Sequence, residues 1–137
     1  MEDDQLQQIP KYSNRVRLLI IVALLLAFRY SLETSGAMLG MTIRSGGRRM
    51  VEFFHLSSND NNVDVAVKLA DHEDFSVALT AMYAMTLLAP NASESGRERI
   101  VQKLSELCTG DHPKHVKCQA GVFLDLLDDS YTCDTCE

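Results

Sequence analysis

The sequence has few residues that interrupt helices. Only three of its 137 residues are proline and seven are glycine, so long helices can form with few breaks. Tryptophan is absent, whereas alanine, leucine and methionine recur through the apolar stretches and favour helix over strand. An apolar share of 46% and a charged share of 23% exclude wholesale disorder. We therefore predict one all-α domain, since the chain is too short for two domains of ordinary size.

Motifs that mark common catalytic centres are missing. No glycine-rich phosphate loop follows a strand, and neither G-x-S-x-G nor H-E-x-x-H occurs. His72, Glu73 and Asp74 are consecutive and cannot share one helix face, so we interpret them as part of a helix start. Cys118 lies one helical turn from His115, but no third residue to orient such a pair is evident. The sequence thus predicts a protein that is not an enzyme.

Positive charge is scarce in the second part of the chain. Residues 58–137 carry fourteen acidic and six basic residues, whereas residues 1–57 carry five acidic and seven basic ones. Because an acidic surface repels phosphates, nucleic acid is not expected to bind the second part. Arg44, Arg48 and Arg49 form a basic cluster that could contact an acidic protein, a membrane surface or nucleic acid. A solvated face is the alternative.

A long hydrophobic run is also missing. Residues 18–28 are eleven uncharged apolar positions between Arg17 and Arg29, whereas a membrane-spanning helix needs about 20. Arg15 and Arg17 suit a signal peptide, but early acidic residues and the lack of a small-x-small site after Arg29 argue against one. Asn91-Ala92-Ser93 matches a glycosylation acceptor. We expect residues 18–28 to form a helix buried in a small bundle, with membrane attachment or secretion as the alternative.

Breaks in the apolar pattern divide the chain into segments. Residues 1–12 are predicted to be a flexible N-terminus, residues 13–128 a single helical domain, and residues 129–137 a Cys-containing tail. Within the domain, two adjacent glycines predict a hinge near 44–48. The stretch SSNDNN predicts a polar loop over 57–62.

Helical spacing after this loop predicts two pairs of helices. The first pair covers residues 62–70 and 74–89, and the second covers residues 97–108 and 113–128. The residues expected to cap them are Asp71 or Asp74, Ser95 with Glu98, and Asp111 or His112. Pro113 fits the first turn of the last helix, where a missing N–H costs nothing.

The two long helices resemble each other. A shift of 39 residues superposes Val77 on Val116, Ala81 on Ala120, Tyr83 on Val122, Met85 on Leu124 and Leu87-Leu88 on Leu126-Leu127. Paired helices with a period near 40 resemble the HEAT and armadillo families, over residues 62–128. The resemblance implies protein binding on an exposed helical face. The diagnostic proline and arginine of a HEAT unit are missing, and two unrelated helix pairs in a small bundle are the alternative.

Cysteine is absent before residue 108. Four cysteines confined to the last part of a chain of this size do not suggest a disulfide framework. We expect reduced thiols and a cytoplasmic or nuclear location. With two histidines, the cysteines form a candidate zinc site, whose members are Cys108, His112, His115, Cys118, Cys133 and Cys136. If residues 116–128 are one helix, however, the tail must double back fully stretched to bring Cys133 to Cys118. Buried cysteines and solvent-facing histidines are the alternative.

The leading hypothesis is a non-enzymatic interaction or regulatory module that presents a helical face to another protein or to itself. Its candidate contacts are the three arginines with Met82 and Met85, although core packing also explains the methionines. Compact helical chains with a Cys/His-rich end occur among viral accessory proteins, by analogy only. One alternative is a zinc-binding regulator that contacts nucleic acid through Arg44, Arg48 and Arg49. Another is a membrane-attached or secreted protein that uses residues 18–28; no cofactor besides zinc is expected.

Overall fold

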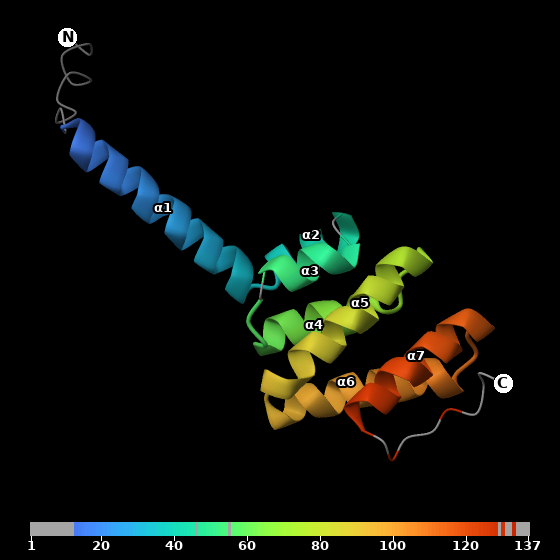
Figure 1. Cartoon of the computed structure of the whole chain (residues 1–137). Helices are drawn as coiled ribbons and strands as arrows, with labels where there is room; N and C mark the ends of the chain where they lie inside the picture. The colour runs from blue at the N-terminus through green and yellow to red at the C-terminus, as the bar shows by residue number, and fades with distance from the viewer. Residues whose placement is uncertain (1–12, 46, 55, 129, 131–132, 134–137) are drawn as a thin grey trace, which may run out of the picture. The chain divides into compact units, whose positions relative to one another are not determined.

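The computed structural model describes residues 13–45, 47–54, 56–128, 130 and 133, and every regular element in this part is helical (Figure 1). The chain divides into two compact units, residues 1–31 and 32–137. Helix α1 (Asn14–Thr34) begins in the first unit. The second unit contains α2 (Ala37–Ser45), α3 (Gly47–Phe54), α4 (Asp60–Leu69), α5 (Phe75–Leu88), the short 3-10 helix η2 (Ala89–Asn91), α6 (Glu94–Thr109) and α7 (Lys114–Leu127). The predicted all-helical class is confirmed.

The second unit is built from three stacked helix pairs. Helix α2 packs against α3, α4 against α5, and α6 against α7. Neighbouring pairs stack in order, because α2 and α6 both pack beside α4, while α3 and α7 both pack beside α5 (Figure 1). The two predicted pairs therefore form, and α2–α3 adds a third. Helices α3, α5 and α7 make up one row of this stack, which we call the second row.

Two glycines shape the first pair. Gly36 precedes α2 with a φ of 80°, and a Cβ there would lie 2.7 Å from Cγ2 of Val65 on α4. Only glycine permits both the left-handed backbone and this close approach of the two helices. Gly47 has a φ of 64° where the chain turns from α2 into α3, within the segment expected to contain a hinge.

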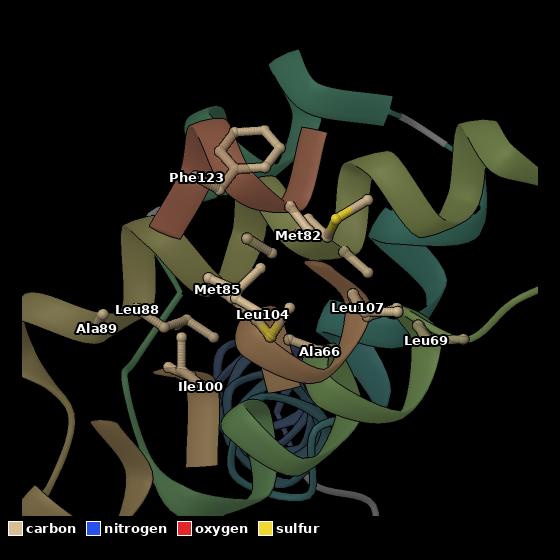
Figure 2. Packing of buried hydrophobic residues seen from close by; sticks show 14 of the residues in the cluster. Ala66, Leu69, Met82, Met85, Leu88, Ala89, Ile100, Leu104, Leu107 and Phe123 are labelled. Carbon is tan, nitrogen blue, oxygen red and sulfur yellow. The ribbon is translucent and has the colours of Figure 1, made fainter. Parts of the chain in front are cut away.

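Helix α5 lies at the centre of the core. It packs against α2, α3, α4 and α7, and eight of its fourteen residues are buried. Met82 and Met85 belong to the same buried apolar cluster as Leu104 and Leu107 of α6 (Figure 2). Both methionines are fully buried, so they fill the core and do not contribute to an exposed contact surface.

The helix starts follow local side-chain chemistry. Asp74 accepts a hydrogen bond from the Ser76 amide at 2.8 Å and caps α5, as one of the two predicted alternatives. Helix α6 begins after Ser93, whose hydroxyl accepts from the Gly96 amide at 3.0 Å. The predicted cap at Ser95 is therefore wrong, because Ser95 already lies within the first turn. Pro113 precedes α7, which has no side-chain cap.

The apolar side chains of helix α1 are exposed. None of its residues is buried, and its large apolar side chains from Val16 to Phe28 are 38% to 68% exposed. Among the described residues, the hydrophobic core takes members from α2 to α7 and none from α1. The other helices fill the core of the second unit, and the expectation that residues 18–28 are buried in a bundle stays a prediction. In the described part of the chain, no helix has both the length and the apolar character required to cross a bilayer.

Candidate functional site

Equivalent positions of α5 and α7 place apolar side chains on the surface. Leu87 is 42% exposed and Leu126 is 72% exposed, and the 39-residue shift superposes these two residues. The same shift superposes half-buried Tyr83 on Val122, which is 50% exposed. The rings of Tyr83 and Phe123 lie 6.4 Å apart, so this part of α5 is level with the turn of α7 that carries Val122. We call Tyr83, Leu87, Val122 and Leu126 the row surface.

Arg48 extends the row surface onto α3. Its guanidinium carbon lies 4.0 Å from the centroid of the Tyr83 ring, a cation–π contact. Its Nε atom lies 3.9 Å from Oε1 of Glu52, and the Tyr83 hydroxyl donates a hydrogen bond to the same carboxylate oxygen. Hydrogen bonding with Tyr83 raises the pKa of Arg48. These contacts hold the Arg48 side chain over the row surface, whereas Arg44 and Arg49 are exposed on α2 and α3.

A hollow of about 320 Å³ borders the row surface where α3 faces α5. Its lining residues are Leu39, Val51, Glu52, Leu56, Ser58, Ala84, Leu87, Leu88 and Asn91. The lining is mostly apolar, with the Glu52 carboxylate at one side and Leu87 shared with the row surface. Such a hollow can accept an apolar side chain, while the carboxylate can orient a donor.

The cysteines form disulfides. Cys108, buried at the end of α6, is bonded to Cys133, and their Cα atoms lie 6.2 Å apart. Cys133 lies against Gly121 of α7, so the chain beyond α7 returns along that helix. Cys118 is also disulfide-bonded, and Cys136 lies outside the described residues. The prediction of reduced thiols is wrong, because spacing alone does not show that the tail returns. A cytoplasmic or nuclear location loses that support, since structural disulfides persist in oxidising environments.

Among the described residues, the predicted zinc ligands do not form a metal site. A disulfide sulfur is not a thiolate, and the thiolate is the form that binds zinc. Within residues 13–45, 47–54, 56–128, 130 and 133, no three His, Cys, Asp or Glu side chains are arranged to hold a metal ion. Zinc binding by these cysteines therefore requires a reduced form of the chain.

Three histidines gather at one end of the stack. His72, His112 and His115 line a hollow of about 350 Å³ at the turns α4–α5 and α6–α7. The His115 ring meets the Phe75 ring edge to face, with centroids 4.6 Å apart. Nδ1 of His72 accepts a hydrogen bond from the Asp74 amide at 3.0 Å, which fits its interpretation as part of a helix start. Stacking thus brings together two turns that each carry an Asp-His sequence.

Sequence reasoning did not select the residues of the row surface. The available signal was the 39-residue shift, which already matched Leu87 with Leu126 and Tyr83 with Val122. Only the stacking order shows that these matched positions face outward. Comparison with known proteins offers no further guide, because no family model, curated protein or solved structure matches this chain.

Proposed function

We propose that the second unit is a non-enzymatic protein-interaction module that binds its partner through the row surface. Exposed apolar side chains at equivalent positions of stacked helices support this function, because helix-pair stacks commonly bind partners on such repeated faces. Isolated exposed leucines are ordinary, whereas Leu87 and Leu126 occupy matched positions of two helices that pack against each other, and Val122 is exposed one turn before Leu126.

The residues in and beside the row surface suggest which kind of surface the partner has. Tyrosine and arginine are enriched among residues that dominate binding energy, and Tyr83 and Arg48 already contact each other beside the apolar residues. Their contact reduces the side-chain entropy that binding would cost. The neighbouring hollow accommodates one apolar side chain, and Arg48 can pair with a carboxylate. We therefore expect an apolar helical face that bears an acidic residue, on another protein or on a second copy of this chain.

Paired substitutions on the row surface test the proposal. The double variant Leu87→Gln with Leu126→Gln removes one exposed apolar side chain from each of α5 and α7 without emptying the core. The matched control is Met41→Gln on α2, which is 52% exposed but lies in the other row. Circular dichroism establishes that each variant retains its helices.

Two measurements then report binding. Proteins cross-linked to the wild type and the control, but not to the double variant, identify the partner, whose affinity is measured with purified components. We expect the double variant to bind at least about tenfold more weakly, from the loss of two apolar side chains. Light scattering detects self-association in the same series. Equal affinity or equal self-association of the wild type and the double variant would contradict the proposal.

A further inference from the structure

Residues 18–28 of α1 are apolar around the whole circumference of the helix. Successive residues of a helix are separated by about 100°, so Leu18 and Leu25 lie on one side while Ile20 and Leu24 lie on the other. All four side chains are exposed, and none of the 21 residues of α1 is buried. A helix of this kind requires cover on every side rather than along one stripe.

The charges of α1 are of one sign up to its last turn. Arg15 and Arg17 precede the apolar residues 18–28, and Arg29 follows them. The first acidic residue of the helix is Glu33. Anionic groups are therefore the charges that complement both ends of the apolar segment.

A lipid bilayer meets these two requirements better than a protein does. A protein groove or a second copy of α1 covers one side of the helix, whereas a helix that lies just below the headgroups has acyl chains on both flanks as well as beneath it. Eleven apolar residues span about 16 Å, roughly half of a bilayer core of about 30 Å, so the segment does not fit across it. With the helix lying along the bilayer surface, Arg17 and Arg29 can both extend to the headgroups.

We propose that α1 inserts lengthwise into the surface layer of an anionic bilayer. Residues 18–28 lie among the upper acyl chains, and Arg15, Arg17 and Arg29 contact lipid phosphates. The partner is thus a lipid surface with negatively charged headgroups. This binding is independent of the row surface, which belongs to the second unit.

Flotation of the full-length protein with vesicles tests the proposal. Vesicles of phosphatidylcholine with phosphatidylglycerol should carry the wild type upward through a density gradient, and vesicles of phosphatidylcholine alone should carry less. Substituting Arg15→Gln and Arg17→Gln should weaken binding to the anionic vesicles by about fivefold per arginine at low salt. Binding to neutral vesicles should change much less. Equal binding of the wild type to both vesicle types would overturn the anionic preference.

Variants on opposite sides of α1 distinguish immersion from one-sided docking. Both Leu18→Gln with Leu25→Gln and Ile20→Gln with Leu24→Gln should reduce vesicle binding by at least about tenfold. The control, Met41→Gln with Met50→Gln, changes two exposed apolar side chains outside both α1 and the row surface and should float like the wild type. Loss of binding in only one α1 variant, or in neither, would overturn the proposal. Oligomers that form through α1 while vesicles remain unbound would also overturn it.

Discussion

Gly121 of α7 lies directly against Cys133, because a Cβ at position 121 would be only 2.8 Å from Cβ of Cys133. The same Cβ would be 3.5 Å from Sγ of Cys133 and 3.9 Å from Sγ of Cys108. The disulfide between these cysteines therefore occupies the space that a side chain at position 121 would fill. The absence of a side chain here permits the chain beyond α7 to return and bond to α6.

This contact predicts that Gly121→Ala lowers the free energy of unfolding when the Cys108–Cys133 disulfide is present and raises it when the disulfide is absent. In the wild-type background, the added methyl group must displace the disulfide, so the free energy of unfolding should fall by about 1 kcal/mol or more. In a Cys133→Ser background without the bond, alanine should instead stabilise α7 by roughly 0.5 to 1 kcal/mol through its higher helix propensity. Urea unfolding of the four proteins measures both effects. A gain in both backgrounds would show that Cys133 does not lie against Gly121.

The disulfide itself should contribute much of the stability of the second unit. Its cysteines are separated by 25 residues, and closing such a loop in the unfolded chain is worth about 3 kcal/mol. We expect Cys133→Ser to lower the free energy of unfolding by roughly this amount under oxidising conditions. Peptide mapping without reduction should recover the peptides of Cys108 and Cys133 joined. Free thiols at both positions in protein kept oxidised would contradict the structure.

The pairs α4–α5 and α6–α7 could be predicted because their apolar spacing is regular and their ends carry clear signals. Ile100, Leu104 and Leu107 follow helical spacing in α6, and all three are buried. The pair α2–α3 could not be predicted, because its helices have nine and eight residues and too few turns for a clear period. Its position depends on a long-range contact, the approach of Gly36 to Val65.

The exposed surfaces could not be predicted from periodicity alone. Met85 and Leu87 lie two residues apart in one apolar helix, yet Met85 is fully buried and Leu87 is exposed. Which side of α5 faces outward depends on α3 and α7, which pack beside it. For α1, the apolar run shows only that residues 18–28 require cover, and it does not show whether protein or lipid provides it.

The cap of α6 predicts different effects on stability for substitutions of Ser93 and Ser95. The Ser93 hydroxyl accepts from the Gly96 amide and donates to Oδ1 of Asp60 at 2.9 Å, so it joins the start of α6 to the start of α4. Ser93→Ala should therefore cost about 1 kcal/mol of unfolding free energy. Ser95→Ala, two residues along, should be neutral or slightly stabilising because alanine is the better helix former. Thermal unfolding measures the stability of both variants. A larger loss of stability for Ser95→Ala would indicate that Ser95 is the cap, as predicted from the sequence.

A nearly buried ammonium group joins the last two helix pairs. The Lys103 side chain on α6 is only 10% exposed, and its Nζ atom forms an ion pair with the Asp71 carboxylate at the end of α4. A second carboxylate, that of Glu106, lies 3.7 Å from the same nitrogen. Asp71 is half exposed, so solvent screens the pair and its loss costs less than that of a fully buried one.

The pair can be tested with a double-mutant cycle. Asp71→Asn should lower the free energy of unfolding by about 1 kcal/mol, because Lys103 then retains only one carboxylate in a poorly hydrated position. Lys103→Met should cost less, since the apolar side chain fills the same space without a charge to solvate. In the Lys103→Met background, Asp71→Asn should have almost no effect, as the carboxylate no longer has a partner to lose. Equal costs of Asp71→Asn in both backgrounds would show that the two groups do not interact.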